Sequence, residues 1–380
     1  MAKVHEVLNI RVSAGRPQVV TSKTFRSINH GCKKMTKKTS IGILVGAGSI
    51  GKRHAKKLIE QYELVIVVDP EPSLMNWVQT ELRSQDLYFS ELSVALAHIV
   101  SNANETTAVI ANLGPDHFST FNQLADFGIR RILCEKPMAV SVKQIDVMAA
   151  RIKSDNISFT VGLQRRYSGL CSLLRSIGEE YLGGKPVAVV GHGGAQCLIT
   201  TGMHWIDLCI DLFEDNPEAV SAIAQPQRIN PRSPLLEMWS GTAAWAFPND
   251  RYLTLTYSNS SSVEGELVIY CPTGRLEIDP NGVITMHQRK SSEVAADNRI
   301  TRVGEAFLSG VIEIKPNLVH PTIQMLDELD AEVELTYTTT AAGVSANAAL
   351  GLLISATTKQ EVQLPVSNLN EYYGFEWSVT

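Results

Sequence analysis

The sequence predicts an α/β protein of two domains, one built on a parallel sheet and the other on an open, mostly antiparallel sheet. The first observation is a strand, a glycine-rich turn, a helix, a second strand and an acid in one continuous segment, Ile41 to Asp69. The second is an alternation of helical and strand-like segments to about residue 160, typical of a parallel sheet with crossover helices. The third is a change beyond residue 165 to strand-like runs of period two, which indicates antiparallel pairing.

The glycines of the first segment predict a dinucleotide site. They stand at Gly46, Gly48 and Gly51, a pattern that combines a tight turn, room for a pyrophosphate and close packing of helix on strand. The free N–H groups of Ser49, Ile50 and Gly51 begin the next helix. We expect them to face the phosphates, whose negative charge the helix dipole favours.

The acid that closes the segment indicates which dinucleotide binds. Asp69 follows the apolar run Leu64–Val68, about 20 residues past the turn, where a carboxylate accepts hydrogen bonds from the adenosine ribose and repels a 2′-phosphate. The predicted cofactor is therefore NAD rather than NADP. An ordinary strand-to-helix turn is the alternative, and the strand, helix and acid around the glycines disfavour it. Lys52 and Arg53 are interpreted as solvated, whereas His54 is a candidate for packing under the phosphate loop.

Composition bounds the class of protein. The 380 residues suffice for two cores, and a net charge of −5 gives no reason to expect a nucleic-acid partner. No apolar run is expected to reach the length of about 20 residues that a membrane helix needs. The cysteines lack CxxC pairs and histidines at metal-ligand spacing, which predicts reduced, buried thiols, no metal site and a cytoplasmic protein. They are Cys32, Cys134, Cys171, Cys197, Cys209 and Cys271.

The predicted domains are residues 41–160 for dinucleotide binding and 161–380 for substrate binding and oligomerisation. Residues 1–40 are a basic extension, interpreted as a flexible tail. A transit peptide, an arm for an acidic partner, and an extension upstream of a start at Met35 are the alternatives. Its basic residues, against the single acid Glu6, are Lys3, Arg11, Arg16, Lys23, Arg26, Lys33, Lys34, Lys37 and Lys38.

Two segments follow predicted strands of the parallel sheet, at the edge where ligands bind. One runs from Asn112 to His117, and the other is Glu135–Lys136–Pro137. An ammonium at the second position would point into the cofactor cleft and hydrogen-bond a hydroxyl; the alternative is a surface lysine paired with Glu135. The cofactor contacts expected here are Asn112, Pro115, His117, Glu135 and Lys136.

A helix over residues 201–213 of the second domain carries His204 and Asp207. Because they are three residues apart, they share one helix face, and Asp207 is a candidate to orient the imidazole for proton transfer near neutral pH. A core histidine satisfied by a helix partner is the alternative. Further helices are expected at 167–181 and 341–357, with strands at 187–191, 219–224, 242–247, 252–258, 264–271, 275–278, 283–287 and 360–365.

Several motifs together resemble the glucose-fructose oxidoreductase, inositol dehydrogenase and MocA (Gfo/Idh/MocA) family, nearly end to end from Ile41. They are GAGSIGKRHAKKL, NLGPDH, EKPMAVSV from Glu135, GLQRRY from Gly162, TGMHWIDL from Thr201, and a closing helix followed by VQLP at Val362. The resemblance implies a Rossmann domain joined to an α/β domain with an open antiparallel sheet. In that family the outer face of the sheet often builds dimers or tetramers, so a homodimer or homotetramer is expected.

The resemblance also implies roles for residues. Lys136 would contact the reacting hydroxyl and the nicotinamide ribose, and His204 would be the acid/base. In many members an aspartate precedes that histidine by four residues; here the position is Thr200, which cannot act as a charged proton acceptor. Either the proton relay would fall to His204 and Lys136 alone, or the chain would not turn over.

Residues of the GLQRRY motif would form the rim of the cofactor or substrate site. Of Arg165, Arg166 and Tyr167, Arg166 is the candidate for contacting a carboxylate or phosphate, with a surface ion pair as the alternative. The candidate substrate residues are Arg166, Tyr167, Thr200 and His204. Specificity is expected from Gln164–Tyr167, Gly191–Thr201 and the loop from Arg228 to Trp239, none of which is regular enough to identify the substrate.

The leading hypothesis is an NAD-dependent dehydrogenase that transfers hydride between nicotinamide and a secondary alcohol or ketone of a sugar, polyol or nucleotide sugar. One alternative is a catalytically silent NAD-binding sensor or regulator, motivated by Thr200 and the basic extension. The other is a redox-neutral NAD-dependent glycoside hydrolase, which the family also contains.

Overall fold

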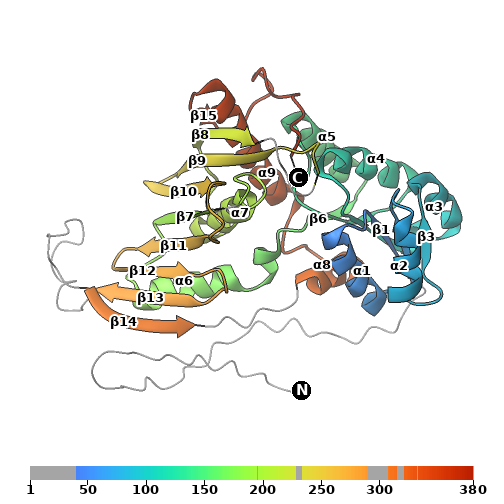
Figure 1. The fold of residues 1–380 in the computed structure, drawn as a ribbon, viewed down its shortest axis with the longest axis horizontal. Helices are drawn as coiled ribbons and strands as arrows, with labels where there is room; N and C mark the ends of the chain where they lie inside the picture. Colours follow the sequence, from blue (N-terminus) through green and yellow to red (C-terminus); the bar gives the residue numbers. More distant parts are fainter. Residues whose placement is uncertain are drawn as a thin grey trace.

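The computed structural model of the chain describes residues 40–194, 196–227, 233–289, 307–314, 321–331 and 333–379. Residues 1–39, which carry the predicted basic extension, and residues 228–232 of the predicted specificity loop lie outside this range. Figure 1 shows two sheets, with the smaller sheet and its helices on the right and the larger sheet on the left.

The smaller sheet is parallel and belongs to the amino-terminal half. Among the described residues it has six strands in the order β3-β2-β1-β4-β5-β6. Helices cover both of its faces, which explains why its central strands are near-continuous apolar runs. The strands are β1 (Ile41–Val45), β2 (Leu64–Val68), β3 (Leu87–Phe89), β4 (Thr106–Ile110), β5 (Arg131–Cys134) and β6 (Ser158–Val161). The main helices are α1 (Ser49–Gln61), α2 (Ser73–Glu81), α3 (Leu92–His98), α4 (His117–Phe127) and α5 (Val142–Ser154).

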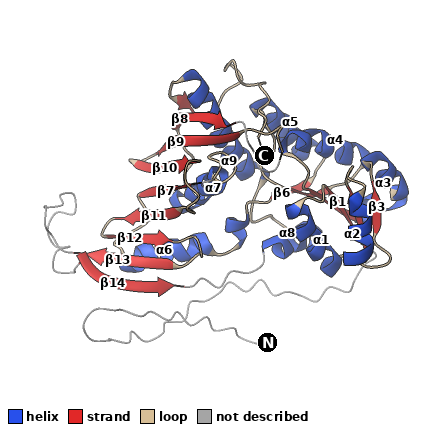
Figure 2. Ribbon diagram, in the orientation of Figure 1, coloured by secondary structure: helices blue, strands red, loops and turns tan. Residues whose placement is uncertain are grey.

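The larger sheet follows in the chain and is mixed. Its nine described strands have the order β14-β13-β12-β11-β7-β10-β9-β8-β15, and all neighbours are antiparallel except β7 and β10. The strands are β7 (Ala188–Gly194), β8 (Ala219–Gln227), β9 (Met238–Phe247), β10 (Arg251–Ser258), β11 (Glu266–Cys271), β12 (Gly274–Ile278), β13 (Ile284–Arg289), β14 (Phe307–Ile314) and β15 (Val362–Gln363). The predicted fold class is therefore confirmed (Figure 2).

Helices pack on one face of this sheet. They are α6 (Leu170–Tyr181), α7 (Gly202–Phe213) and α9 (Thr339–Thr358). Along β10 the buried residues Leu253, Leu255 and Tyr257 alternate with more exposed ones, among them Tyr252, so the described residues leave the opposite face of the sheet uncovered. This is the alternation expected of an antiparallel sheet with one solvated face.

Helix α9 corrects one prediction. With 20 residues and a mean hydropathy of 1.3 over its most apolar window, it is long and apolar enough to cross a membrane by length and composition alone. No segment of that kind was expected from the sequence. Most of the window is buried inside the fold, against α5, α7 and β8, as in the core helix of a soluble domain.

The sequence analysis did not predict helix α8 (Pro321–Ala331), which lies beside α1 (Figure 1). Its buried side chains Met325, Leu326 and Leu329 join the core, and the helix touches β4 and β5 of the parallel sheet. Thr107 Oγ1 on β4 donates a hydrogen bond of 2.6 Å to Asp330 Oδ1. A helix from late in the chain thus completes the packing of the amino-terminal domain.

Candidate active site

The glycine turn between β1 and α1 has the geometry of a phosphate-binding loop. Gly46 has φ +93°, and a Cβ there would lie 2.3 Å from the backbone nitrogen of Asn112. A Cβ on Gly51 would lie 2.0 Å from the Gly46 oxygen, so helix and turn touch through backbone atoms. At Gly48 a Cβ would meet nothing within 4 Å. The turn therefore needs two of its glycines for its own packing, while the third faces open space.

The start of α1 lacks the groups that usually satisfy a helix end. No side chain caps it, and its first turn contains no acid. The first intrahelical bond to the turn runs from the Lys52 nitrogen to the Gly48 oxygen, 2.9 Å, so the N–H groups of Ser49, Ile50 and Gly51 can donate hydrogen bonds to an anion. The open space at Gly48 and these donors fit the pyrophosphate of NAD.

Asp69 lies at the end of β2 beside this turn. Its Oδ2 accepts a 2.7 Å hydrogen bond from the Ala47 nitrogen, and its Oδ1 accepts a 2.9 Å bond from the Glu71 nitrogen. The carboxylate is thus held next to the glycine turn, and each oxygen keeps a lone pair for a ribose hydroxyl. This arrangement fits the adenosine ribose of NAD.

A buried acid and a histidine connect the phosphate loop to the end of β5. His54 Nε2, on α1, lies 2.8 Å from Glu135 Oε1. Burial raises the pKa of Glu135, but the bond from His54 and the nearby Lys136 outweigh it, so the pKa is lowered. A Cβ on Gly162 would lie 2.8 Å from Glu135 Oε1, so that glycine makes room for the carboxylate. His54 is buried and pairs with Glu135, while its packing under the phosphate loop stays a prediction.

Glu135 and His117, both predicted to contact the cofactor, form hydrogen bonds inside the protein. Glu135 is buried against His54, and its Oε2 lies 3.3 Å from the Lys136 nitrogen. His117 is buried, with Nδ1 2.7 Å from the Pro137 oxygen and Nε2 3.1 Å from the Asn112 oxygen. Direct contact with the cofactor stays a prediction for both residues, whose side chains also form hydrogen bonds inside the protein.

His117 nevertheless holds two loops of the cofactor edge together. Burial lowers its pKa, which favours the neutral ring. Asn112 Nδ2 donates a hydrogen bond of 2.8 Å to Thr120 Oγ1. Pro115 is half-buried in the short 3₁₀ turn Gly114–Asp116. Lys136 is half-buried directly after β5, at the edge where the cofactor is expected.

The second domain contributes α7, which begins after a turn that carries Thr200. His204 is in the first turn of α7 and is half-buried. Asp207 is 1% exposed and accepts bonds from the Arg166 guanidinium at 3.0–3.2 Å and from Ser345 Oγ at 2.9 Å. Burial raises the pKa of Asp207, against the opposing effect of Arg166. The carboxylate expected to orient His204 is thus held by Arg166 and α9.

Arg166 and Tyr167, which were predicted for the substrate rim, both form contacts within the protein. The Arg166 guanidinium bonds Asp207 and lies 3.4 Å from Asp211 Oδ1, so its charge is compensated within the protein. The Tyr167 hydroxyl is buried, 3.0 Å from Thr160 Oγ1, and burial raises its pKa. Both side chains hold the domains together, because each joins the segment after β6 to elements of the second half.

The neighbouring Arg165 has different surroundings. Its guanidinium carbon lies 3.9 Å from the centre of the Trp205 ring, on the residue after His204. Burial lowers its pKa to about 10. The segment that carries it, a 3₁₀ turn over Gln164–Tyr167, contacts α7. Arg165 therefore lies at the junction of the cofactor edge and the helix that carries His204.

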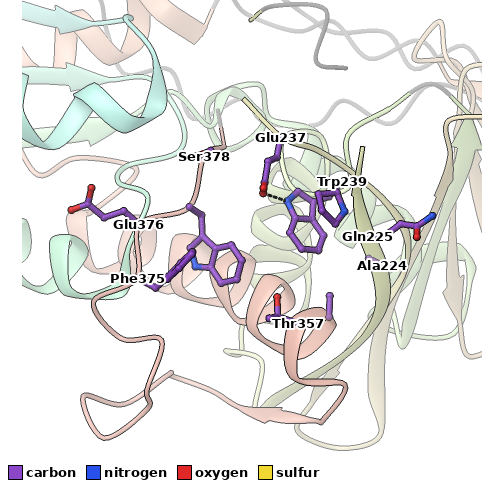
Figure 3. Close-up of a pocket in the computed structure, with 11 residues that line it drawn as sticks. Ala224, Gln225, Glu237, Trp239, Thr357, Phe375, Glu376 and Ser378 are labelled. Carbon is purple, nitrogen blue, oxygen red and sulfur yellow. Dashed lines mark hydrogen bonds between the residues drawn. The ribbon is translucent and has the colours of Figure 1, made fainter. Parts of the chain in front are cut away.

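A hollow of about 390 Å³ lies where β8 ends and β9 begins. Figure 3 shows its lining. Trp239, Trp377 and Phe375 form its aromatic wall, and Trp239 Nε1 donates a 2.9 Å hydrogen bond to Glu237. Glu237 and Trp239 are the described end of the predicted specificity loop. The lining of this hollow includes neither Lys136 nor His204.

The parallel sheet, its glycine turn and the acid after β2 define a Rossmann-type dinucleotide-binding domain. Residues 41–163, about a third of the chain, match the family model described as an oxidoreductase family with an NAD-binding Rossmann fold, GFO_IDH_MocA. NAD is accordingly its cofactor. The resemblance read from the motifs is confirmed.

The chain is 28% identical over 196 residues to an inositol 2-dehydrogenase of Acidothermus cellulolyticus. The aligned region covers 48% of this chain and 55% of that enzyme, so it spans about half the length of the curated relative.

Solved structures share the fold along most of the chain. An apo scyllo-inositol dehydrogenase from Lactobacillus casei superposes with TM-score 0.61 at 17% identity, covering 87% of this chain and 99% of that one. A UDP-N-acetylglucosamine 3-dehydrogenase from Acidithiobacillus ferrooxidans gives 0.66 at 16% identity, covering 86% and 100%. An NAD-binding protein from Listeria innocua gives 0.70 at 14% identity, covering 88% and 100%.

Proposed function

We propose that this protein is an NAD-dependent dehydrogenase that oxidises a secondary alcohol of a sugar, polyol or nucleotide sugar, or reduces the matching ketone. The observation that carries the proposal is the position of Lys136. It follows β5 on the sheet edge to which the glycine turn and Asp69 also belong. Bound NAD supplies a hydride acceptor at this edge.

Lys136 and His204 are assigned the proton chemistry. The Lys136 ammonium holds the substrate oxygen and stabilises the negative charge that develops there as the C–H bond breaks. His204 takes the hydroxyl proton, a role that suits a side chain with an unperturbed pKa of about 6.5. Asp207 is assigned a positioning role, because its carboxylate anchors α7 to Arg166 and Ser345.

The test is an assay of NADH formation with NAD and a panel of substrates. The names of the relatives suggest inositols, scyllo-inositol among them, and UDP-N-acetylglucosamine as the first members. Lys136→Met and His204→Asn should each remove turnover while NAD affinity changes little. Lys153→Met, an exposed lysine on α5, is the control for loss of charge. Full activity in both site variants would contradict the assignment.

Thr200 favours a second candidate, an NAD-binding sensor or regulator without turnover. A threonine in the turn before α7 provides no carboxylate to accept a proton. NAD bound by the purified protein, together with no NADH formed from any panel member, would support this candidate. Release of a chromogenic leaving group without net NADH would instead indicate the redox-neutral glycoside hydrolase.

The uncovered face of the larger sheet supports a homodimer or homotetramer as part of the proposal. Tyr252 and Tyr270 are exposed on neighbouring parts of that sheet, and Ile223 is 87% exposed on β8. Apolar side chains of this kind are typical of surfaces that associate. The mass of the purified protein by light scattering tests it; a monomer at micromolar concentration would contradict it.

A further inference from the structure

Arg165 differs from every other half-buried arginine that the structure describes. The others each donate a hydrogen bond to a carboxylate or carbonyl oxygen: Arg83, Arg130, Arg131, Arg151, Arg166, Arg175, Arg251 and Arg275. No oxygen of the described residues accepts a bond from the Arg165 guanidinium, and no carboxylate of those residues forms an ion pair with it. A half-buried guanidinium without an acceptor is unfavourable unless a ligand or water fills that role.

The surroundings hold this guanidinium in place but leave its charge uncompensated. Trp205 covers it at 3.9 Å, and stacking on an aromatic ring leaves the N–H groups around the edge of the guanidinium plane available. Tyr257, buried at the end of β10, is the neighbouring residue that most opposes the effect of burial on the Arg165 pKa. Asp207 is the acid whose charge acts on Arg165, and its carboxylate is paired with Arg166.

The sequence around the site is acid-free. Residues 162–178 contain three arginines and no Asp or Glu, and residues 191–206, which include Thr200 and His204, also contain none. Arg166 is paired with Asp207 and Asp211, and Arg175 with Asp211 and Glu214, so Arg165 is the arginine of this segment for which the described residues provide no carboxylate partner. Such a site attracts anions and disfavours a neutral ligand that would leave the guanidinium without an acceptor.

We propose that Arg165 binds an oxyanion on the substrate, so that the preferred substrate is an acidic sugar or polyol carrying a carboxylate or phosphoryl group. This inference rests on the proposed dehydrogenase function and specifies its substrate class. The forked guanidinium suits either oxyanion, because two parallel N–H groups meet two oxygens. Stacking on Trp205 fixes the plane of the Arg165 guanidinium. His204, the residue before Trp205, takes the proton from the hydroxyl group of the same substrate molecule.

The experiment compares D-glucose, D-glucuronate and D-glucose 6-phosphate on the full chain saturated with NADH. Binding is measured by calorimetry and by quenching of tryptophan fluorescence, to which Trp205 contributes. Wild-type protein should bind at least one acidic probe tenfold or more tightly than glucose, a preference that shrinks with added salt. The two acids separate a carboxylate site from a phosphoryl site.

Arg165→Gln should abolish that preference while leaving NADH affinity unchanged, and Arg165→Lys should restore only part of it. Arg275→Gln, which removes an arginine paired with Glu277 on the larger sheet, is the matched control and should bind like wild type. Equal binding of glucose and both acids by the wild type would overturn the proposal. The proposal would also be overturned if Arg165→Gln lost affinity for NADH and kept its affinity for the acidic probe.

A parallel rate assay with NAD separates this inference from the proposed function. Acid binding that depends on Arg165, without any NADH formed, would support the anion site and count against the dehydrogenase. NADH formed equally well from neutral and acidic polyols, unaffected by Arg165→Gln, would support the dehydrogenase and overturn the anion site.

Discussion

Gly48 and Gly51 provide a test that separates cofactor binding from folding. A Cβ at Gly48 would touch nothing within 4 Å, and its φ of −62° and ψ of −168° are extended, so alanine fits the empty site. Gly48→Ala should therefore change the free energy of unfolding by less than about 0.5 kcal/mol. The same methyl group would stand where the pyrophosphate approaches the N–H groups at the start of α1.

The expected loss of NADH affinity follows from those N–H groups. If the methyl group prevents one charge-assisted hydrogen bond, about 1.5–3 kcal/mol is lost. Since about 1.4 kcal/mol corresponds to a factor of ten, NADH should bind roughly 10- to 150-fold more weakly. Calorimetry or NADH fluorescence measures the affinity, and urea unfolding without cofactor measures the stability.

Gly51→Ala is the contrasting variant. Its Cβ would lie 2.0 Å from the Gly46 oxygen, which is backbone and cannot move aside as a side chain does. Overpacking of this kind costs about 1–3 kcal/mol, so the protein without cofactor should itself be destabilised. The reasoning would be refuted if Gly48→Ala bound NADH like wild type, or if it lost as much stability without cofactor as Gly51→Ala.

Other variants test the buried charges. Because the pKa of Glu135 is lowered in the fold, its stabilising effect is present above the usual glutamate pKa of about 4.3 and disappears as the pH falls through the lowered value. Glu135→Gln should therefore flatten the acid side of a stability-against-pH curve; an unchanged slope would exclude the His54 pair as its source. Gly162→Ala should cost about 1–3 kcal/mol in urea unfolding, since its Cβ would lie 2.8 Å from Glu135 Oε1, and wild-type stability would contradict that. Arg166→Met leaves Asp207 buried without its cation and should cost about 3–5 kcal/mol, partly recovered by adding Asp207→Asn; additive losses in the double variant would argue against the pair.

The sequence predicted what depends on local pattern. The glycine turn, the acid after β2 and the alternation of helical and strand-like segments predicted the parallel sheet. The short strand β3 was missed because three residues are too few to show a period. Helix α8 was missed as well, although its buried positions Met325, Leu326 and Leu329 follow a helical spacing.

The candidate site was harder to predict because its partners are distant in the chain. Ser345 reaches Asp207 across 138 residues, and His54 reaches Glu135 across 81. Two adjacent arginines in a motif cannot be told apart by spacing, yet a turn of 3₁₀ helix directs one to Asp207 and the other to Trp205. The anion contact predicted for Arg166 is now proposed for its neighbour for that reason.

The docking of α8 on the parallel sheet has a consequence for synthesis of the chain. Residues 41–163 emerge from the ribosome long before Pro321–Ala331, so during translation the surface that will receive Leu326 and Leu329 stays open to water. The nascent dinucleotide domain cannot reach its final packing until the second domain has been made. A fragment cut after residue 163 would expose the same apolar patch, so expression of the Rossmann unit alone should yield aggregates, and a version with α8 joined through a linker should be more soluble.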